Sequence, residues 1–295
     1  MGGCFAPGPI DQRDMDMRSF KIFALAAATT AVLATGHARA ADLPPLLPPP
    51  PMIEEYGGWY LRGDIGMTNQ LVGSLDNALF PGTLDLVIHD KNFEAGMLFG
   101  LGIGYRHNSW FRWDLIGEYR GETGFHGFDT WTDGAADPRF NDYTAKKSEW
   151  LLMWNAYLDL GTWKGITPFV GAGIGASRIG IHSFRDAGIA AAADGGGPTL
   201  GYANSASKWN LAWALHAGLA YDVTPNFTIE LAYRYIDLGD GRSGDIIGFD
   251  GTNTLYNPMH FKNITSHDVK LGVRWALADM GISHWQPPQP VYSKY

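Results

Sequence analysis

The strongest constraint on the fold is an alternation of residue character with a period of two. Between residues 93 and 106, Phe, Ala, Met, Phe, Leu, Ile and Tyr occupy every second position, and Glu, Gly and Arg fill most positions between them. A β-strand places successive side chains on opposite faces, whereas a helix would mix the two sets. The segment therefore predicts a strand with one large apolar face and one small or polar face.

Seven further segments show the same alternation. No stretch after the first 40 residues is apolar and long enough for a transmembrane helix, and mean hydropathy is only −0.13. The sequence therefore predicts an all-β fold. The eight expected strands lie at residues 59–68, 93–106, 111–120, 149–160, 170–175, 209–222, 228–235 and 268–277.

The composition of the two faces indicates which of them is buried. A soluble β-sandwich points its apolar face inward and carries polar residues of many sizes outside. In this chain the polar face is mainly glycine and alanine with charges of both signs, while the apolar face is rich in large residues, with Trp and Tyr near the strand ends. These features are typical of outer-membrane barrels. We therefore expect an eight-stranded antiparallel transmembrane β-barrel with its apolar face toward lipid.

The interior of an eight-stranded barrel is narrow, so charges that point inward must pair with one another. The alternation places seven cations and eight carboxylates on the inward face, and it predicts an interior charge network. The expected members are Arg62, Arg106, Arg112, Arg120, Arg234, Lys270 and Arg274, with Asp64, Glu94, Asp114, Glu118, Glu149, Asp159, Glu230 and Asp268.

The connections between the expected strands alternate in length. Short links at residues 106–110, 161–166 and 223–226 alternate with long segments at 69–92, 121–147, 178–207 and 238–264. Outer-membrane barrels have short periplasmic turns and long extracellular loops. The spacing therefore predicts four long extracellular loops, with both ends of the barrel segment on the periplasmic side.

The N-terminal region is typical of an exported protein. Residues 1–40 contain a basic start after Met17, an apolar stretch at 22–33 and the sequence Ala-Arg-Ala before position 41, so they predict an N-terminal extension and signal peptide. The start codon, Met1 or Met17, stays open. The expected domains after residue 40 are a Pro-rich periplasmic linker at 41–55, the barrel at 56–277 and a Pro-containing periplasmic tail at 278–295.

Four segments together carry a family resemblance. They are residues 59–66 (WYLRGDIG), 167–175 (TPFVGAGIG), 230–235 (ELAYRY) and 268–275 (DVKLGVRW). In this order they resemble the porin-family, OmpA-like small barrels of alphaproteobacterial outer membranes, the RopB-type surface antigens. The resemblance implies a cell outer membrane location and contact with outer-membrane lipid, lipopolysaccharide and the barrel assembly machinery.

The same resemblance implies an attachment point. Some related barrels begin, after signal cleavage, with Ala-Asp and are joined through that amine to peptidoglycan, and Ala41-Asp42 matches them. The chain continues about 18 residues beyond the last expected strand, whereas barrels of this class often end on a terminal aromatic residue. Ala41 is therefore expected to join peptidoglycan, with residues 41–55 as a spacer.

Three functions remain open at this stage: a structural barrel that maintains the envelope and presents surface loops, a small-solute porin of low conductance, and a lipid-modifying enzyme. Catalysis is disfavoured because Ser266, His267 and Asp268 are neighbours on a strand and point to alternating faces. His216 is expected to be a structural residue of the interior. We expect no catalytic, cofactor or metal-binding residue and no nucleic-acid partner, since net charge is −8. The sequence leaves the oligomeric state open.

Overall fold

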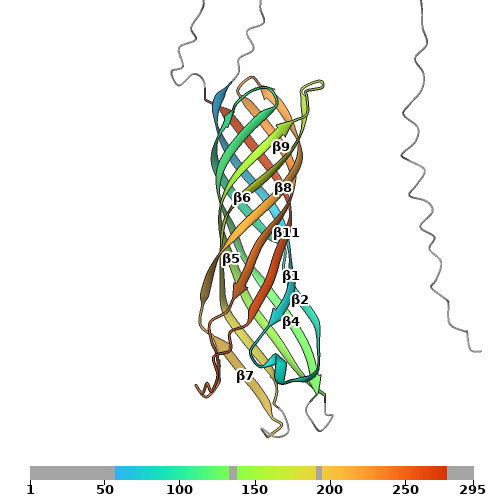
Figure 1. The fold of residues 1–295 in the computed structure, drawn as a ribbon, viewed down its shortest axis with the longest axis vertical. Helices are drawn as coiled ribbons and strands as arrows, with labels where there is room; N and C mark the ends of the chain where they lie inside the picture. The colour runs from blue at the N-terminus through green and yellow to red at the C-terminus, as the bar shows by residue number, and fades with distance from the viewer. Residues whose placement is uncertain (1–56, 133–137, 191–194, 278–295) are drawn as a thin grey trace, which may run out of the picture. The chain divides into compact units, whose positions relative to one another are not determined.

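The computed structural model describes residues 57–132, 138–190 and 195–277, which form an antiparallel β-structure (Figure 1). Within these ranges the helical content is one 3₁₀ turn, η1 (Phe80–Gly82), and no described helix is long and apolar enough to cross a membrane. The expected signal peptide, both proline-containing segments and Ala41 lie outside the described residues.

Eight strands pair in a closed ring, each antiparallel to its two neighbours. All eight strands expected from the alternation are present. The ring closes between the first and last of them, from the pair Tyr60 and Ala276 to the pair Asp76 and His260. In order around the barrel, the strands are β1 (Gly58–Asp76), β3 (Gly96–Arg106), β4 (Phe111–Thr132), β5 (Pro138–Asp159), β6 (Ile166–Ile189), β8 (Ala206–Thr224), β9 (Phe227–Arg242) and β11 (His260–Ala276).

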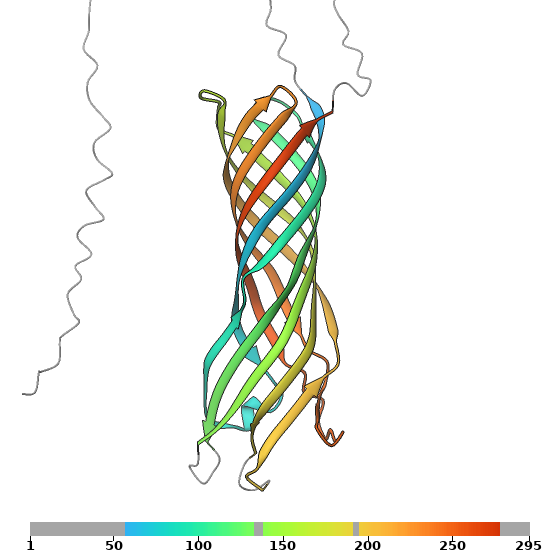
Figure 2. The ribbon, with the colours of Figure 1, turned by 180° about the vertical axis from the view of Figure 1, so that it is seen from behind.

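The barrel has two different ends. At one end, which we call the turn end, residues 107–110, 160–165 and 225–226 make the three short connections predicted from the sequence. At the other, the far end, three shorter strands extend the wall (Figures 1 and 2). β2 (Leu84–Phe93) pairs mainly with β4, β7 (Pro198–Ala203) pairs with β6, and β10 (Ile246–Gly248) pairs with β7.

The prediction of four long loops at residues 69–92, 121–147, 178–207 and 238–264 is wrong for most of their length, because the strands continue into them. β4 and β5, for example, stay paired from Phe111 and Leu158 to Thr132 and Pro138. The alternation persists in these extensions with its polarity reversed. Phe125 is buried and its neighbour His126 is exposed, so the apolar residues now face inward.

The outward face of the turn-end half carries a continuous apolar band. On β5, Trp150, Leu152, Trp154 and Leu158 are each 43–55% exposed and share this face. Ten residues of a tilted strand rise about 25 Å, the height of the apolar band of an outer-membrane barrel. The band ends on β5 at Trp150, and the next outward residue, Ser148, is polar.

The interior is packed in three layers. The layer at the turn end includes Tyr157 and Phe169, and the middle layer is charged. Glycine makes room in the first layer, because a Cβ on Gly104 would lie 2.2 Å from the ring of Tyr60. The far-end layer is an apolar cluster. Its largest members are Phe93, Phe125, Tyr143, Ile179, Ile181, Phe184, Phe261 and Ile264.

Candidate functional site in the barrel interior

The middle layer is a network of seven cations and seven carboxylates, which we call the interior charge network. Every member is less than 9% exposed and forms at least one ion pair. The eight strands position these side chains, because each strand sends every second residue inward. The members are Arg62, Arg112, Arg120, Lys147, Arg234, Lys270 and Arg274, with Asp64, Asp114, Glu118, Glu149, Asp159, Glu230 and Asp268.

The part of the network nearer the turn end centres on Glu230. Its carboxylate lies 2.8 Å from Nε of Arg274, 3.0 Å from Nη2 of Arg112 and 3.2 Å from Nη2 of Arg62. Arg112 also contacts Asp159 at 3.1 Å, and its guanidinium lies 4.1 Å from the ring centre of Tyr157. One carboxylate thus joins three arginines from β1, β4 and β11.

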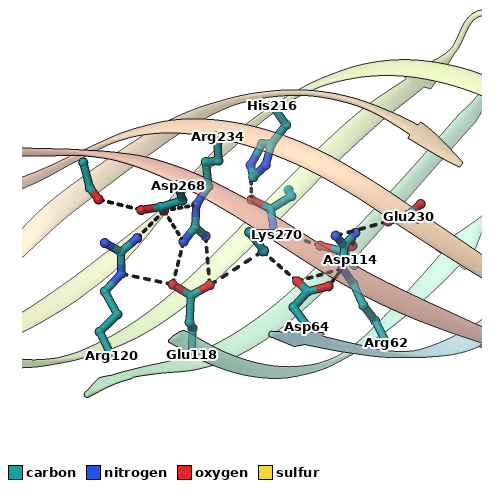
Figure 3. Close-up of polar contacts among 12 residues, drawn as sticks. Arg62, Asp64, Asp114, Glu118, Arg120, His216, Glu230, Arg234, Asp268 and Lys270 are labelled. Carbon is teal, nitrogen blue, oxygen red and sulfur yellow. Dashed lines mark hydrogen bonds and ion pairs between the residues drawn. The ribbon is translucent and has the colours of Figure 1, made fainter. Parts of the chain in front are cut away.

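The part nearer the far end centres on Glu118 (Figure 3). Its oxygens lie 2.6 Å from Nη2 of Arg234, 3.1 Å from Nε of Arg120 and 3.6 Å from Nζ of Lys270. Asp268 accepts from Arg120 at 2.6 Å and from Arg234 at 2.8 Å. Arg234 is therefore shared between two carboxylates and Arg120 between three, since Glu149 also lies 3.6 Å from its Nε.

Asp64 joins the two parts. It lies 2.6 Å from Nζ of Lys270 on one side and 3.0 Å from Nε of Arg62 on the other, as Figure 3 shows. Arg62 continues to Asp114 at 3.0 Å, and Asp114 accepts a hydrogen bond of 2.8 Å from Asn155. The result is one connected network in which each charge has a counter-charge, the arrangement that offsets the cost of burial.

The structure brings thirteen of the fifteen expected network residues together and places the other two, Glu94 and Arg106, elsewhere. Glu94 is exposed on the outer wall, where it accepts a hydrogen bond from the Gly124 amide. The reason is the interruption between β2 and β3 at residues 94 and 95, which shifts the alternation so that Phe93 points inward instead. Arg106, another expected member, is also exposed, at the turn end of β3.

Sequence reasoning missed Lys147 as a network member. It is buried, pairs with Glu149 and lies 4.2 Å from the ring centre of Phe93. The signal was present, since Lys147 is two residues from Glu149 and shares its face. The predicted loop at residues 121–147 includes Lys147, because the outward residues near it are no longer apolar.

Ser266, His267 and Asp268 do not share one side of the wall, and His216 lies inside it. Ser266 and Asp268 point inward and share a hydrogen bond of 2.5 Å, whereas His267 points outward and contacts the hydroxyl of Tyr233 at 2.6 Å. His216 is buried, and its Nε2 lies 3.2 Å from Oδ1 of Asn155. The described residues hold no group of three or more His, Cys, Asp or Glu side chains with metal-site geometry.

An acidic group lies at the far end, beyond the apolar cluster. Burial raises the pKa of Asp186 to about 7, and the charges of Asp129 and Asp142 add to the effect. Asp129 accepts hydrogen bonds from Tyr143 at 2.6 Å and from Asn141 at 3.0 Å, but burial outweighs them and raises its pKa as well. Asp186 is therefore largely protonated below neutral pH.

Taken together, the charged layer and the apolar cluster above it fill the described interior. The ring strands β4 and β9 lie opposite each other, and Arg112 and Glu230 meet between them, as do Glu118 and Arg234. Side chains that meet across the diameter leave no continuous water-filled path at their level.

Comparison with known proteins gives consistent matches. Residues 26–276 match the family model described as outer membrane protein beta-barrel domain. An uncharacterized protein of Brucella abortus is 28% identical over 277 residues, which cover 83% of this chain and 94% of that protein. Outer membrane protein PagN of Salmonella typhimurium is 30% identical over 181 residues, covering 60% of this chain and 71% of PagN. The crystal structure of Neisserial surface protein A is similar at 17% identity and a TM-score of 0.40, covering 76% of this chain and all of that one.

Proposed function

The chain belongs to the outer-membrane β-barrel domain family, and on that basis we propose that it is a closed structural barrel that strengthens the outer membrane and presents its far end at the cell surface. The single observation that carries this proposal is the filled interior. Fourteen buried charges pair within one layer, and an apolar cluster covers them. A barrel built to conduct would keep a polar, hydrated lumen.

The placement in the membrane follows from the outward face. The apolar band near the turn end matches the hydrocarbon layer, and tryptophans and tyrosines stand at both of its edges. Trp59 contacts Tyr105 and Trp113 at one edge, and Tyr119 contacts Trp150 at the other. We place the turn end in the periplasm and the far end outside the cell, because short turns face the periplasm in this class.

The reversed polarity of the far-end wall supports the same placement. In water, a β-wall buries apolar residues and exposes polar ones. Phe125, Ile181 and Phe261 are buried there, while Glu122, Lys146 and Lys262 point outward. The part of the barrel beyond the apolar band is therefore built for an aqueous surrounding.

Conductance tests this function directly. Purified full-length protein is reconstituted in planar bilayers, and folding is checked by the shift of gel mobility on heating. A closed structural barrel gives at most small, infrequent current steps. Large steady channels would contradict the proposal and support the porin alternative. Changes in lipid A seen by mass spectrometry after incubation would support the enzyme alternative.

Attachment to peptidoglycan through Ala41 stays a prediction, since the residue lies outside the described ranges. Mass spectrometry of digested cell walls checks it. Muropeptides that carry a peptide beginning Ala41-Asp42 would support the attachment, and their absence from cells that make the protein would contradict it.

A further inference from the structure

Among the described residues, Arg178 on β6 has no acidic partner, although it stands where the apolar band ends. The outward residues of β6 on the turn-end side of it are Ala176, Ile174, Ala172 and Val170. Its Nη2 donates a hydrogen bond of 3.1 Å to the hydroxyl of Ser207. No carboxylate of the described residues forms an ion pair with Arg178.

Three lysines on the outward side of the far-end wall do have an acidic partner. Lys146 lies 2.6 Å from Glu122, Lys208 lies 2.9 Å from Asp240, and Lys262 lies 2.6 Å from Asp76. A cation at the edge of hydrocarbon is tolerated when its side chain reaches toward polar groups. Ser207 is one such group for Arg178, and an anion bound there would add the counter-charge that the described residues do not supply.

The surroundings of Arg178 indicate the level in the membrane at which that anion lies. In the strand register, Arg178 is flanked by Trp150 on β5 and Trp209 on β8, which are 55% and 64% exposed. Exposed tryptophans favour the boundary between hydrocarbon and headgroups. The hydrogen bond to Ser207 points the guanidinium toward the far end, away from the apolar residues, because Ser207 pairs with Gly180 rather than with Arg178.

Two hydroxyl groups and a glycine complete the site. Gly180 lies beside the guanidinium's partner Ser207 and carries no side chain, and Ser148 is its register partner on the other strand. A Cβ placed on Gly180 would come no closer than 3.7 Å to Ser148. An arginine guanidinium can bind a phosphate group through two parallel hydrogen bonds. Hydroxyl groups beside it can donate further hydrogen bonds to the same phosphate.

We propose that Arg178, with Ser148 and Ser207, binds the phosphate group of a lipid headgroup in the outer leaflet. The inference rests on the membrane placement of the proposed function. The bound phosphate supplies the missing counter-charge, and the two tryptophans contact the adjoining acyl region. The site adds a fixed lipid to the wall of β5, β6 and β8.

The test compares three single substitutions in full-length protein. Each protein is folded into phosphatidylcholine bilayers that contain phosphatidic acid, and native mass spectrometry counts the bound phosphatidic acid. Arg178→Gln is expected to weaken retention about tenfold, the usual effect of losing charge-assisted hydrogen bonds. Arg178→Lys keeps the charge without the fork and is expected to fall between wild type and Arg178→Gln. Arg185→Gln, the matched control, changes an exposed arginine further along the same strand and is expected to retain lipid as wild type does.

The outcomes separate the site from the function. Equal retention by wild type and Arg178→Gln, with both proteins inserted and heat-modifiable, would overturn the lipid site and leave the proposed function intact. A wild-type chain that fails to insert would overturn the proposed function and the site with it. Displacement of phosphatidic acid by millimolar inorganic phosphate, in bilayers as readily as in detergent, would assign the site to free phosphate and overturn its role in the membrane.

Discussion

Nη2 of Arg234 lies 2.6 Å from Oε1 of Glu118, although the two residues are 116 positions apart in the sequence. Their strands, β9 and β4, are opposite members of the eight-stranded ring, so this ion pair spans the barrel. The contact links two walls that no backbone hydrogen bond joins. Ion pairs of the charged layer therefore connect opposite walls of the barrel through its interior.

Glu118→Gln is expected to lower the free energy of unfolding by about 3–5 kcal/mol, because it leaves Arg234, Arg120 and Lys270 with too little counter-charge in a buried site. Urea-induced unfolding from lipid vesicles measures the change. Glu122→Gln is the matched control on the same strand. Glu122 is exposed, and water screens its pairs with Lys146 and His182, so its substitution is expected to change stability much less. An equal decrease in the free energy of unfolding for the two variants would contradict a stabilising role of Glu118 that depends on its burial.

Phe261→Ala tests the apolar cluster above the charges. Phe261 is fully buried, with its ring centre 4.8 Å from that of Phe125 and 6.0 Å from that of Phe93. Removal of a buried phenyl ring leaves a cavity and costs about 3–5 kcal/mol. The same unfolding assay checks it. Phe249→Ala, at a site that is 78% exposed, is expected to change stability by less than about 0.5 kcal/mol.

Leu215→Arg tests the membrane placement. Leu215 is 53% exposed in the middle of the apolar band of β8, so an arginine there would face hydrocarbon and cost about 2–4 kcal/mol. Leu255→Arg is the control, since Leu255 is 48% exposed near the far end, in water. Stability in vesicles and yield of folded protein measure both. A penalty of the same size at both sites would show that the band does not contact lipid.

Asp186→Asn tests the acidic group at the far end. The pKa of Asp186 is raised from 3.8 to about 7, so between these values the folded protein holds a proton that the unfolded chain has released. The free energy of unfolding therefore falls as pH rises from about 4 to about 7, and it is greatest below that window. The variant is expected to flatten this dependence in unfolding curves taken across the range.

Asp250→Asn is the control for the pH experiment. Asp250 is exposed, and hydrogen bonds from Thr252 lower its pKa below 3.8, so its own titration lies beneath the window. Wild type and Asp250→Asn are expected to share one slope between pH 4 and 7. A slope in Asp186→Asn as steep as in wild type would assign the pH dependence to other groups.

The turn-end half of the barrel could be predicted from the sequence because its surroundings are constant. Each strand there meets lipid on one side and a narrow interior on the other, so parity alone assigns most residues to the correct face, Arg106 at the turn end of β3 being an exception. This reasoning found all eight strands, the short turns and residues such as Arg62, Glu118 and Lys270 of the network.

The far-end half could not be predicted in the same way because water replaces lipid outside. The rule that apolar residues face outward reverses on the far-end side of Ser148, so segments with buried Phe125 and exposed His126 resemble loops when judged by the lipid rule. A single break had a similar effect at Glu94, since two residues outside the ladder change the parity of all that precede them. In both cases the face on which a side chain lies depends on how the strands pair, and the periodicity of one segment does not show this.

In the proposed membrane placement, the strand extensions also set how far the protein projects from the cell surface. β4 continues thirteen residues beyond Tyr119, to Thr132, which is a rise of about 30 Å for a tilted strand. In the proposed placement, the hairpin that it forms with β5 starts at the bilayer surface. The backbone hydrogen bonds between the two strands fix how far it projects. Outward side chains along the described part of the hairpin can therefore change without altering the distance at which another molecule first contacts the protein.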